Sequence, residues 1–285
     1  MADPAAQNGV DETRLGVDLK FACELERLGD LARCFVASEL DAEGEAFLAT
    51  TLGRSHTRWA YWAHRTLTLF LSDFDANALL GMYPVFLLST PGALRLIEAA
   101  RPGGVGAASW LDIGAGSGDV TTRLAPLADA MHTSETSRNM ARRLRRRGFQ
   151  CWLGSVGEGK AGDPLLREPP FEVVSLLNVI DRAPRPRSLL AAVVQQLPSR
   201  GLLVLSTPLP FAPFYYDGSI TRDPLEKLKV SSERWEDALG ELWRNELEPL
   251  GLTLRVVTRL PYLSGGDVQY PAYILDDALL ICEKS

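Results

Sequence analysis

From Ser109 to the C-terminus, short apolar runs alternate with stretches of helical pattern, and this alternation constrains the fold more than any other feature of the chain. Such a pattern is typical of βαβ units that build a parallel sheet. No helix fits between the last two apolar runs, so we expect these two strands to pair antiparallel. The seven predicted strands are 110–113, 130–133, 150–153, 172–177, 202–206, 252–258 and 273–283.

The clearest helical pattern lies between the fifth and sixth of these runs and starts near Ser231. Five parallel strands closed by an antiparallel hairpin predict the Rossmann-like α/β sheet of class I methyltransferases, which differ from dinucleotide dehydrogenases in the reversed last strand. We assign this domain to residues 105–285. The apolar residues of the helix recur at the spacing of one helical face: Trp235, Leu239, Leu242, Trp243, Leu247 and Leu250.

The front of the chain lacks strand alternation and is predicted to be helical. We expect residues 1–16 to be disordered and residues 17–104 to form a helical extension or lid. Asp41 and Ser55 are suitable N-caps for two of its helices. The pair Thr90–Pro91 has the pattern of an N-cap and first-turn proline for a helix that ends near Ala100.

Charge and composition argue against several kinds of site. The chain has 30 Lys and Arg against 36 Asp and Glu, a formal charge of -6, which is the wrong sign for binding nucleic acid by overall electrostatics. Its four cysteines and three histidines lack the spacing of metal ligands, so we expect neither a zinc site nor a disulfide framework. Without an apolar leader or a long apolar segment, the chain is predicted to be intracellular, without a membrane span, and monomeric.

A glycine-rich loop follows the first predicted strand. Asp112, Gly114, Gly116 and Gly118 form a D-x-G-x-G-x-G pattern. Glycines at this place let the backbone approach a ligand and expose amides at a helix start, and Asp112 can anchor the loop or water around the ligand. The alternative is an ordinary βα turn, but a dinucleotide fingerprint would need glycine where Asp119 stands.

An acidic residue follows the second predicted strand. Glu135 is placed to accept hydrogen bonds from both hydroxyls of a ribose, although a solvated surface carboxylate is the alternative. The order of loop, strand and acid favours S-adenosylmethionine (SAM) over a nicotinamide cofactor. After the third strand, Ser155 is a further candidate for cofactor binding, and Trp152 fits an adenine wall or the core equally well.

Short polar side chains interrupt the apolar run at the end of the fourth predicted strand. Asn178 and Asp181 lie there, at the edge of an open α/β sheet where ligands bind. The alternative is that they cap the following helix, since Pro184 lies nearby. Spacing alone does not decide between a catalytic role and a capping role.

Several segments together resemble the DREV family, the group of methyltransferase-like protein nine. They are LDIGAGSGDVT, the SET around Glu135, LLNVIDR, LPFAPF, TRLPYL and YILDDALL, and the likeness runs from about Phe70 to the C-terminus. The resemblance implies SAM-dependent methylation of protein histidine at N1 (Nδ1) in His-x-His motifs with a small middle residue. It also implies a role in cofactor binding for the glycine loop and Glu135. The implied histidine site comprises Asn178, Asp181, Arg182, Tyr262 and Tyr273.

The chemistry of methyl transfer suits these residue types. Transfer from a sulfonium is an in-line displacement, so the enzyme mainly aligns a lone pair with the methyl group and excludes water. If Asp181 accepts a hydrogen bond from Nε2–H of the substrate histidine, Nδ1 keeps its lone pair free. Asn178 would orient the substrate, and the two tyrosines would supply walls and hydroxyl donors or merely pack the sheet.

Two other functions remain compatible with the sequence. The same fold methylates small molecules and other protein side chains, because the cofactor loop does not encode the acceptor. A non-catalytic SAM-binding scaffold is a third possibility, against which the presence of Asn178 and Asp181 argues.

Overall fold

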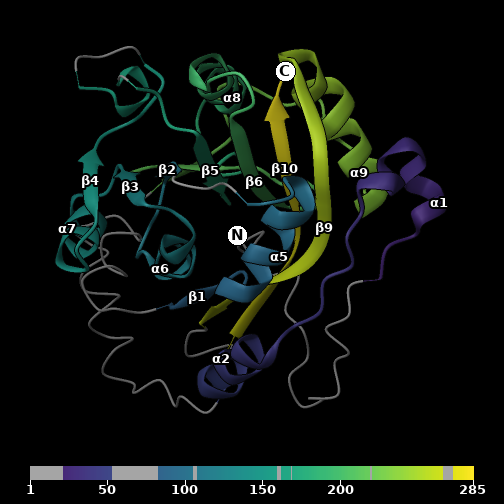
Figure 1. Ribbon diagram of the computed structural model, residues 1–285, viewed down its shortest axis with the longest axis horizontal. Helices are drawn as coiled ribbons and strands as arrows, with labels where there is room; N and C mark the ends of the chain where they lie inside the picture. Colours follow the sequence, from purple (N-terminus) through teal and green to yellow (C-terminus); the bar gives the residue numbers. More distant parts are fainter. Residues whose placement is uncertain are drawn as a thin grey trace.

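The computed structural model describes residues 22–52, 83–104, 108–158, 162–167, 169–218, 220–265 and 272–285. They build a twisted eight-stranded sheet with helices on both faces (Figure 1). Along the sheet the strand order is β1-β9-β10-β6-β5-β2-β3-β4. The strands are β1 (Val85–Phe86), β2 (Ser109–Ile113), β3 (Ala130–Glu135), β4 (Gln150–Leu153), β5 (Val173–Leu177), β6 (Leu202–Pro208), β9 (Leu252–Gly265) and β10 (Ala272–Lys284).

The topology confirms the predicted fold class. Strands β4, β3, β2, β5 and β6 are parallel neighbours. The last strand, β10, is inserted between β6 and β9 and pairs antiparallel with both. Because parallel strands end at the same edge, the segments after β2, β3 and β5 meet at one edge of the sheet.

Three short strands were not predicted. Strand β1 pairs antiparallel with β9 at the edge of the sheet, within the front region that the sequence pattern predicts to be helical throughout. Strands β7 (Tyr215–Asp217) and β8 (Ile220–Arg222) form a separate hairpin. Runs of two or three residues carry no measurable alternation of apolar and polar side chains, so their pattern did not reveal them.

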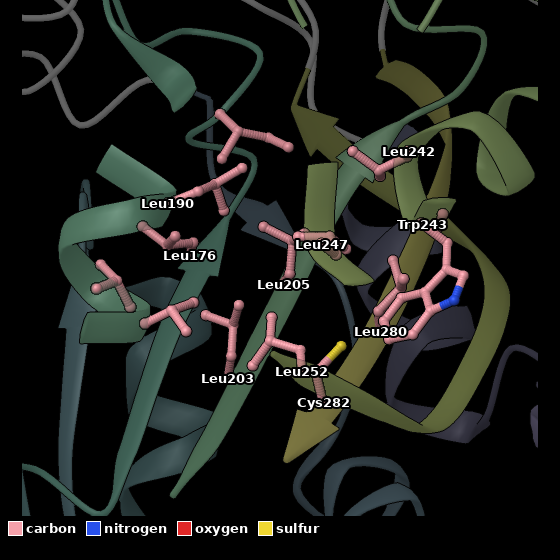
Figure 2. Close-up of a cluster of buried hydrophobic side chains, with 14 of the residues drawn as sticks. Leu176, Leu190, Leu203, Leu205, Leu242, Trp243, Leu247, Leu252, Leu280 and Cys282 are labelled. Atoms are coloured by element: carbon pink, nitrogen blue, oxygen red, sulfur yellow. The ribbon is translucent and has the colours of Figure 1, made fainter. Parts of the chain in front are cut away.

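One face of the sheet is covered by helices α8 (Pro186–Gln196) and α9 (Trp235–Leu242) and by the short helices α1 (Leu25–Leu28) and η2 (Gly29–Cys34). Figure 2 shows the centre of this core, where leucines of the helices meet leucines of the strands. The predicted apolar face of α9 is correct, but the helix starts at Trp235 and continues as a π-turn (Trp243–Leu247) and a final turn (Glu248–Leu250).

The opposite face is covered by α5 (Thr90–Ala100) and α6 (Asp119–Leu124), which pack on Trp110 and neighbouring apolar side chains of the sheet. Helix α5 ends as predicted, but its N-cap is Ser89 rather than Thr90: the Ser89 hydroxyl accepts the Gly92 N–H at 3.0 Å. Helix α7 (Arg138–Arg146) lies between β3 and β4 along the chain.

The front region contains one of the predicted helices, and a polar contact ties its beginning to the sheet. Helix α2 (Ala42–Leu52) starts as predicted at Asp41, which accepts the Gly44 N–H at 3.0 Å. Arg259 on β9 donates to the Ala22 carbonyl at 2.6 Å and forms an ion pair with Asp276. Residues 1–16 and the helix expected after Ser55 lie outside the described residues, so the predicted domain boundaries stay predictions.

Within the described ranges, no helix is both long and apolar enough to span a bilayer.

Candidate active site

The glycine loop connects β2 to α6 and follows a left-handed path. Gly114 and Gly116 have φ of 69° and 55°, values that favour glycine. A Cβ on Gly114 would lie 2.8 Å from Cγ2 of Val179, so this glycine lets the loop touch the segment after β5. A Cβ on Gly116 would meet no atom of the described residues within 4 Å, which leaves space for a ligand there. Gly118, the third predicted glycine, immediately precedes α6.

Asp112 lies behind this loop. Its carboxylate is buried and accepts hydrogen bonds from the Thr121 hydroxyl of α6 and the Ser175 hydroxyl of β5, each at 2.6 Å. Burial raises the pKa of Asp112 to about 6, and these two hydrogen bonds oppose the shift. Of the two roles considered for Asp112, the geometry therefore favours anchoring the loop.

Glu135 ends β3 beside the open side of the loop. One carboxylate oxygen accepts the Gly116 N–H at 2.9 Å, and the other accepts the N–H groups of Thr136 and Ser137 at 2.7 and 2.9 Å. This tether, which was not apparent from the sequence, holds the loop against the acid. The oxygen that binds Thr136 and Ser137 is thereby occupied, whereas the oxygen that accepts the Gly116 N–H still has acceptor capacity for a ribose hydroxyl.

Trp152 on β4 and Ser155 after it have different surroundings. Ser155 is exposed at the same edge of the sheet. The Trp152 ring packs against His132 and Phe171, with centroids 5.5 and 6.3 Å apart, so most of its surface is covered by protein rather than open to an adenine.

The loop and the acid fit an adenosyl methyl donor. The open space at Gly116 admits a ligand close to backbone, and the Glu135 carboxylate beside it suits a ribose diol. No side chain of the described residues fills the position that a Cβ on Gly116 would take.

Asn178 follows β5 in a left-handed conformation, with φ of 54°. Asparagine tolerates this region better than most residues. Its backbone N–H donates to the Ser206 carbonyl at 3.0 Å, and its Oδ1 accepts the Ser206 hydroxyl at 2.6 Å. Helix α8 has Arg185 as its N-cap, so the capping alternative is wrong for both Asn178 and Asp181.

Asp181 is buried at the same edge. One oxygen forms an ion pair with Nη1 of Arg182 at 2.7 Å, whereas Oδ1 has no hydrogen-bond partner among the described residues. Burial raises the pKa of Asp181, and the Arg182 charge opposes the shift. The Arg182 guanidinium also lies 3.9 Å above the Phe214 ring, which fixes its position.

Tyr262 on β9 lies close enough to three carboxylates for their charges to act on its hydroxyl. Burial is the main cause that raises its pKa, and the charges of Asp277, Asp181 and Asp119 raise it further. The phenol is therefore neutral at pH 7 and available as a hydrogen-bond donor. Tyr273 lies on β10 opposite Ser264, four positions before Asp277 along the strand.

One residue of the site was missed by sequence reasoning. Asp277, in the middle of β10, is fully buried, and its Oδ1 lies 3.5 Å from Nδ2 of Asn178. The sequence signal that could have revealed Asp277 is in YILDDALL, where two aspartates interrupt an otherwise apolar strand. The structure thus brings together Asn178, Asp181, Arg182, Tyr262 and Asp277.

Both the sequence and the fold have relatives among known proteins. A family model described as DREV methyltransferase matches residues 21–284. Similar solved structures include the N-methyltransferase NodS from Bradyrhizobium japonicum in complex with S-adenosyl-L-homocysteine (14% identity, 67% of this chain and 84% of that chain, TM-score 0.40). Another is magnesium protoporphyrin IX methyltransferase from Synechocystis with bound SAM (11% identity, 93% and 99%, TM-score 0.43). These two similarities are too remote to transfer a ligand or a substrate.

Proposed function

Because the chain belongs to the DREV methyltransferase family and is SAM-dependent, we propose that it methylates histidine at Nδ1 in His-x-His segments of other proteins, with a small residue at x. The observation that carries this proposal is the buried carboxylate of Asp181. Its Oδ1 lacks a donor among the described residues, at the sheet edge that also carries the glycine loop. An imidazole N–H would supply that missing donor.

SAM supplies an electrophilic methyl group, and the protein controls which nitrogen of the acceptor receives it. Neutral imidazole carries one proton, and only the other nitrogen has a free lone pair. Asp181 accepts the hydrogen bond from Nε2–H, which leaves Nδ1 as the nucleophile. The displacement would break the sulfur–methyl bond of SAM as the new N–C bond forms and would leave S-adenosyl-L-homocysteine as product, while the Asp181 carboxylate stabilises the resulting imidazolium.

The surrounding side chains support this geometry. Arg182 holds Asp181 through the second carboxylate oxygen and leaves Oδ1 free for substrate. Asn178 orients the ring or the substrate backbone, and Tyr262 supplies a wall and a hydroxyl donor. We assign Tyr273 to the outer part of the same substrate site.

Cofactor binding is assigned to the opposite side of the glycine loop. Gly116 gives SAM access to the loop backbone, Gly114 and Gly118 shape the loop through their left-handed conformations and close packing, and Glu135 accepts a hydrogen bond from the ribose. Asp112 supports the loop from behind through Thr121 and Ser175. We also assign Ser155, which follows β4, to cofactor binding.

A small panel of peptides tests the acceptor. We expect a peptide with His-Ala-His to be methylated. Alanine in place of the acceptor histidine removes the nucleophile and should abolish methylation, whereas alanine in place of the other histidine should slow it at least about tenfold, because a lost anchoring contact costs about 1.4 kcal/mol or more. The measurement is the initial rate of methyl transfer from labelled SAM. Equal rates for all three peptides would refute the His-x-His assignment.

A further inference from the structure

Asp277 is a buried acid for which the proposed reaction has no role. Its side chain is fully buried in β10, and its Oδ2 has no hydrogen-bond partner among the described residues. Removing a carboxylate from water costs several kcal/mol unless a cation or strong donors compensate. A residue of this kind inside a sheet therefore needs an explanation.

The partner of its other oxygen is the candidate catalytic amide. Oδ1 of Asp277 accepts a hydrogen bond from Nδ2 of Asn178 at 3.5 Å, and the Ser206 hydroxyl donates to Oδ1 of the same amide at 2.6 Å. The two contacts hold the amide plane from opposite ends. The second N–H of Nδ2 then remains for the acceptor.

In the described part of the chain, no cation forms an ion pair with Asp277. Asp181 faces it from the segment after β5, Tyr262 from β9, and Asp276 precedes it on β10. Arg182 forms its ion pair with Asp181, and Arg259 forms its ion pair with Asp276. Two carboxylates in one buried site do not both ionise readily, so one of them keeps its proton.

Building on the proposed function, we propose that Asp277 is a positioning residue, an uncharged carboxyl group that fixes the Asn178 carboxamide toward the substrate histidine. Asp181, paired with Arg182, keeps the negative charge of the site. Burial and the neighbouring charge of Asp181 raise the pKa of Asp277, and the hydrogen bonds from Asn178 and Ser206 oppose this shift without cancelling it.

Identical substitutions at the two acids separate their roles. Asp277→Asn keeps the size and the acceptor oxygen of an uncharged carboxyl, so we expect turnover within about threefold of wild type, whereas Asp181→Asn loses on the order of a hundredfold. Asp277→Leu removes the contact to Asn178 and is expected to lower kcat by about tenfold or more with unchanged SAM affinity. Should the leucine variant fail to fold, Ser206→Ala removes the other support of the amide and is expected to lower kcat in the same direction.

Stability provides a readout that does not need an active enzyme. A folded-state pKa above that of the unfolded chain means that stability is lost as pH rises between the two values. The carboxamide of Asp277→Asn cannot ionise, so the melting temperature of this variant should gain on wild type as the pH rises from about 4, near the ordinary aspartate pKa of the unfolded chain, toward neutral pH. A constant difference across this range would contradict the uncharged state of Asp277.

The remaining outcomes are distinguishable. Loss of turnover in Asp277→Asn as severe as in Asp181→Asn would show that the charge of Asp277 is needed and would overturn the proposal. Wild-type kcat in Asp277→Leu would do the same, because the contact to Asn178 would then be dispensable. If wild-type protein does not methylate His-x-His peptides at all, the proposed function fails, while the pH dependence of stability still tests the state of Asp277.

Discussion

Asp181→Ala is expected to lower the turnover of His-x-His peptides by on the order of a hundredfold or more, the usual cost of removing one preorganised group from an active site. The change removes both the hydrogen-bond acceptor for Nε2–H and the charge that stabilises the imidazolium. SAM affinity should stay within about twofold of wild type, because Asp181 follows β5, whereas Glu135 and the open side of the loop lie at β3 and β2. Calorimetry and single-turnover kinetics measure the two properties separately.

Two further variants complete this test, namely Asp181→Asn and a control substitution at a distant acid. The asparagine variant keeps an acceptor oxygen but no charge, so it should be impaired no more than the alanine variant. Glu283→Gln is the matched control: Glu283 is a buried acid of β10 that pairs with Leu202 at the opposite edge of the sheet. It should retain wild-type turnover. Near wild-type turnover by Asp181→Ala would contradict the assigned role and move the acceptor of Nε2–H to Asn178 or Tyr262.

Gly116→Leu is expected to lose SAM affinity by about tenfold to a hundredfold, equivalent to the roughly 1–3 kcal/mol cost of overfilling a close-fitting site. The physical reason is the open space at this glycine, which the side chain would occupy instead of the cofactor. Isothermal titration with SAM measures the change. Gly114 is a less suitable probe, since a side chain there would push on Val179 and disturb the segment that carries Asn178.

The control for Gly116 must share its backbone strain. Gly251 has φ of 80°, a Cβ there would meet no atom within 4 Å, and the residue precedes β9 at the edge of the sheet away from the loop. Gly251→Leu carries a comparable left-handed penalty of about 1–2 kcal/mol without entering the site. It should bind SAM normally. An equal loss of SAM affinity in both variants, or no loss in either variant, would contradict the cofactor assignment.

Much of the sheet could be predicted because the signal is repeated. Strands β2, β5 and β6 are buried on both faces, so each appears as a short apolar run bounded by helical pattern. The antiparallel ending followed from the missing helix between β9 and β10, a constraint of chain connectivity. The two-residue strand β1 lacks such a signal, and its pairing depends on the tertiary position of β9.

The site was harder to predict because its contacts join distant parts of the chain. Asn178 and Asp277 are 99 residues apart, and the register of β10 between β6 and β9 brings them together. The capping alternative for Asn178 and Asp181 was open in sequence because both residue types favour helix starts. Only the position of Arg185 as the N-cap of α8 removed it. Likewise, the tether from Glu135 to Gly116 depends on the spatial proximity of the β3 end to the loop.

The most direct test of the account is to identify the methylated atom. A His-Ala-His peptide is incubated with the protein and labelled SAM, hydrolysed, and analysed by chromatography and mass spectrometry that separate the two ring isomers of methylhistidine. Because Asp181 is assigned to Nε2–H, the account predicts that the label is on Nδ1. Label on Nε2, or on a residue other than histidine, would contradict it.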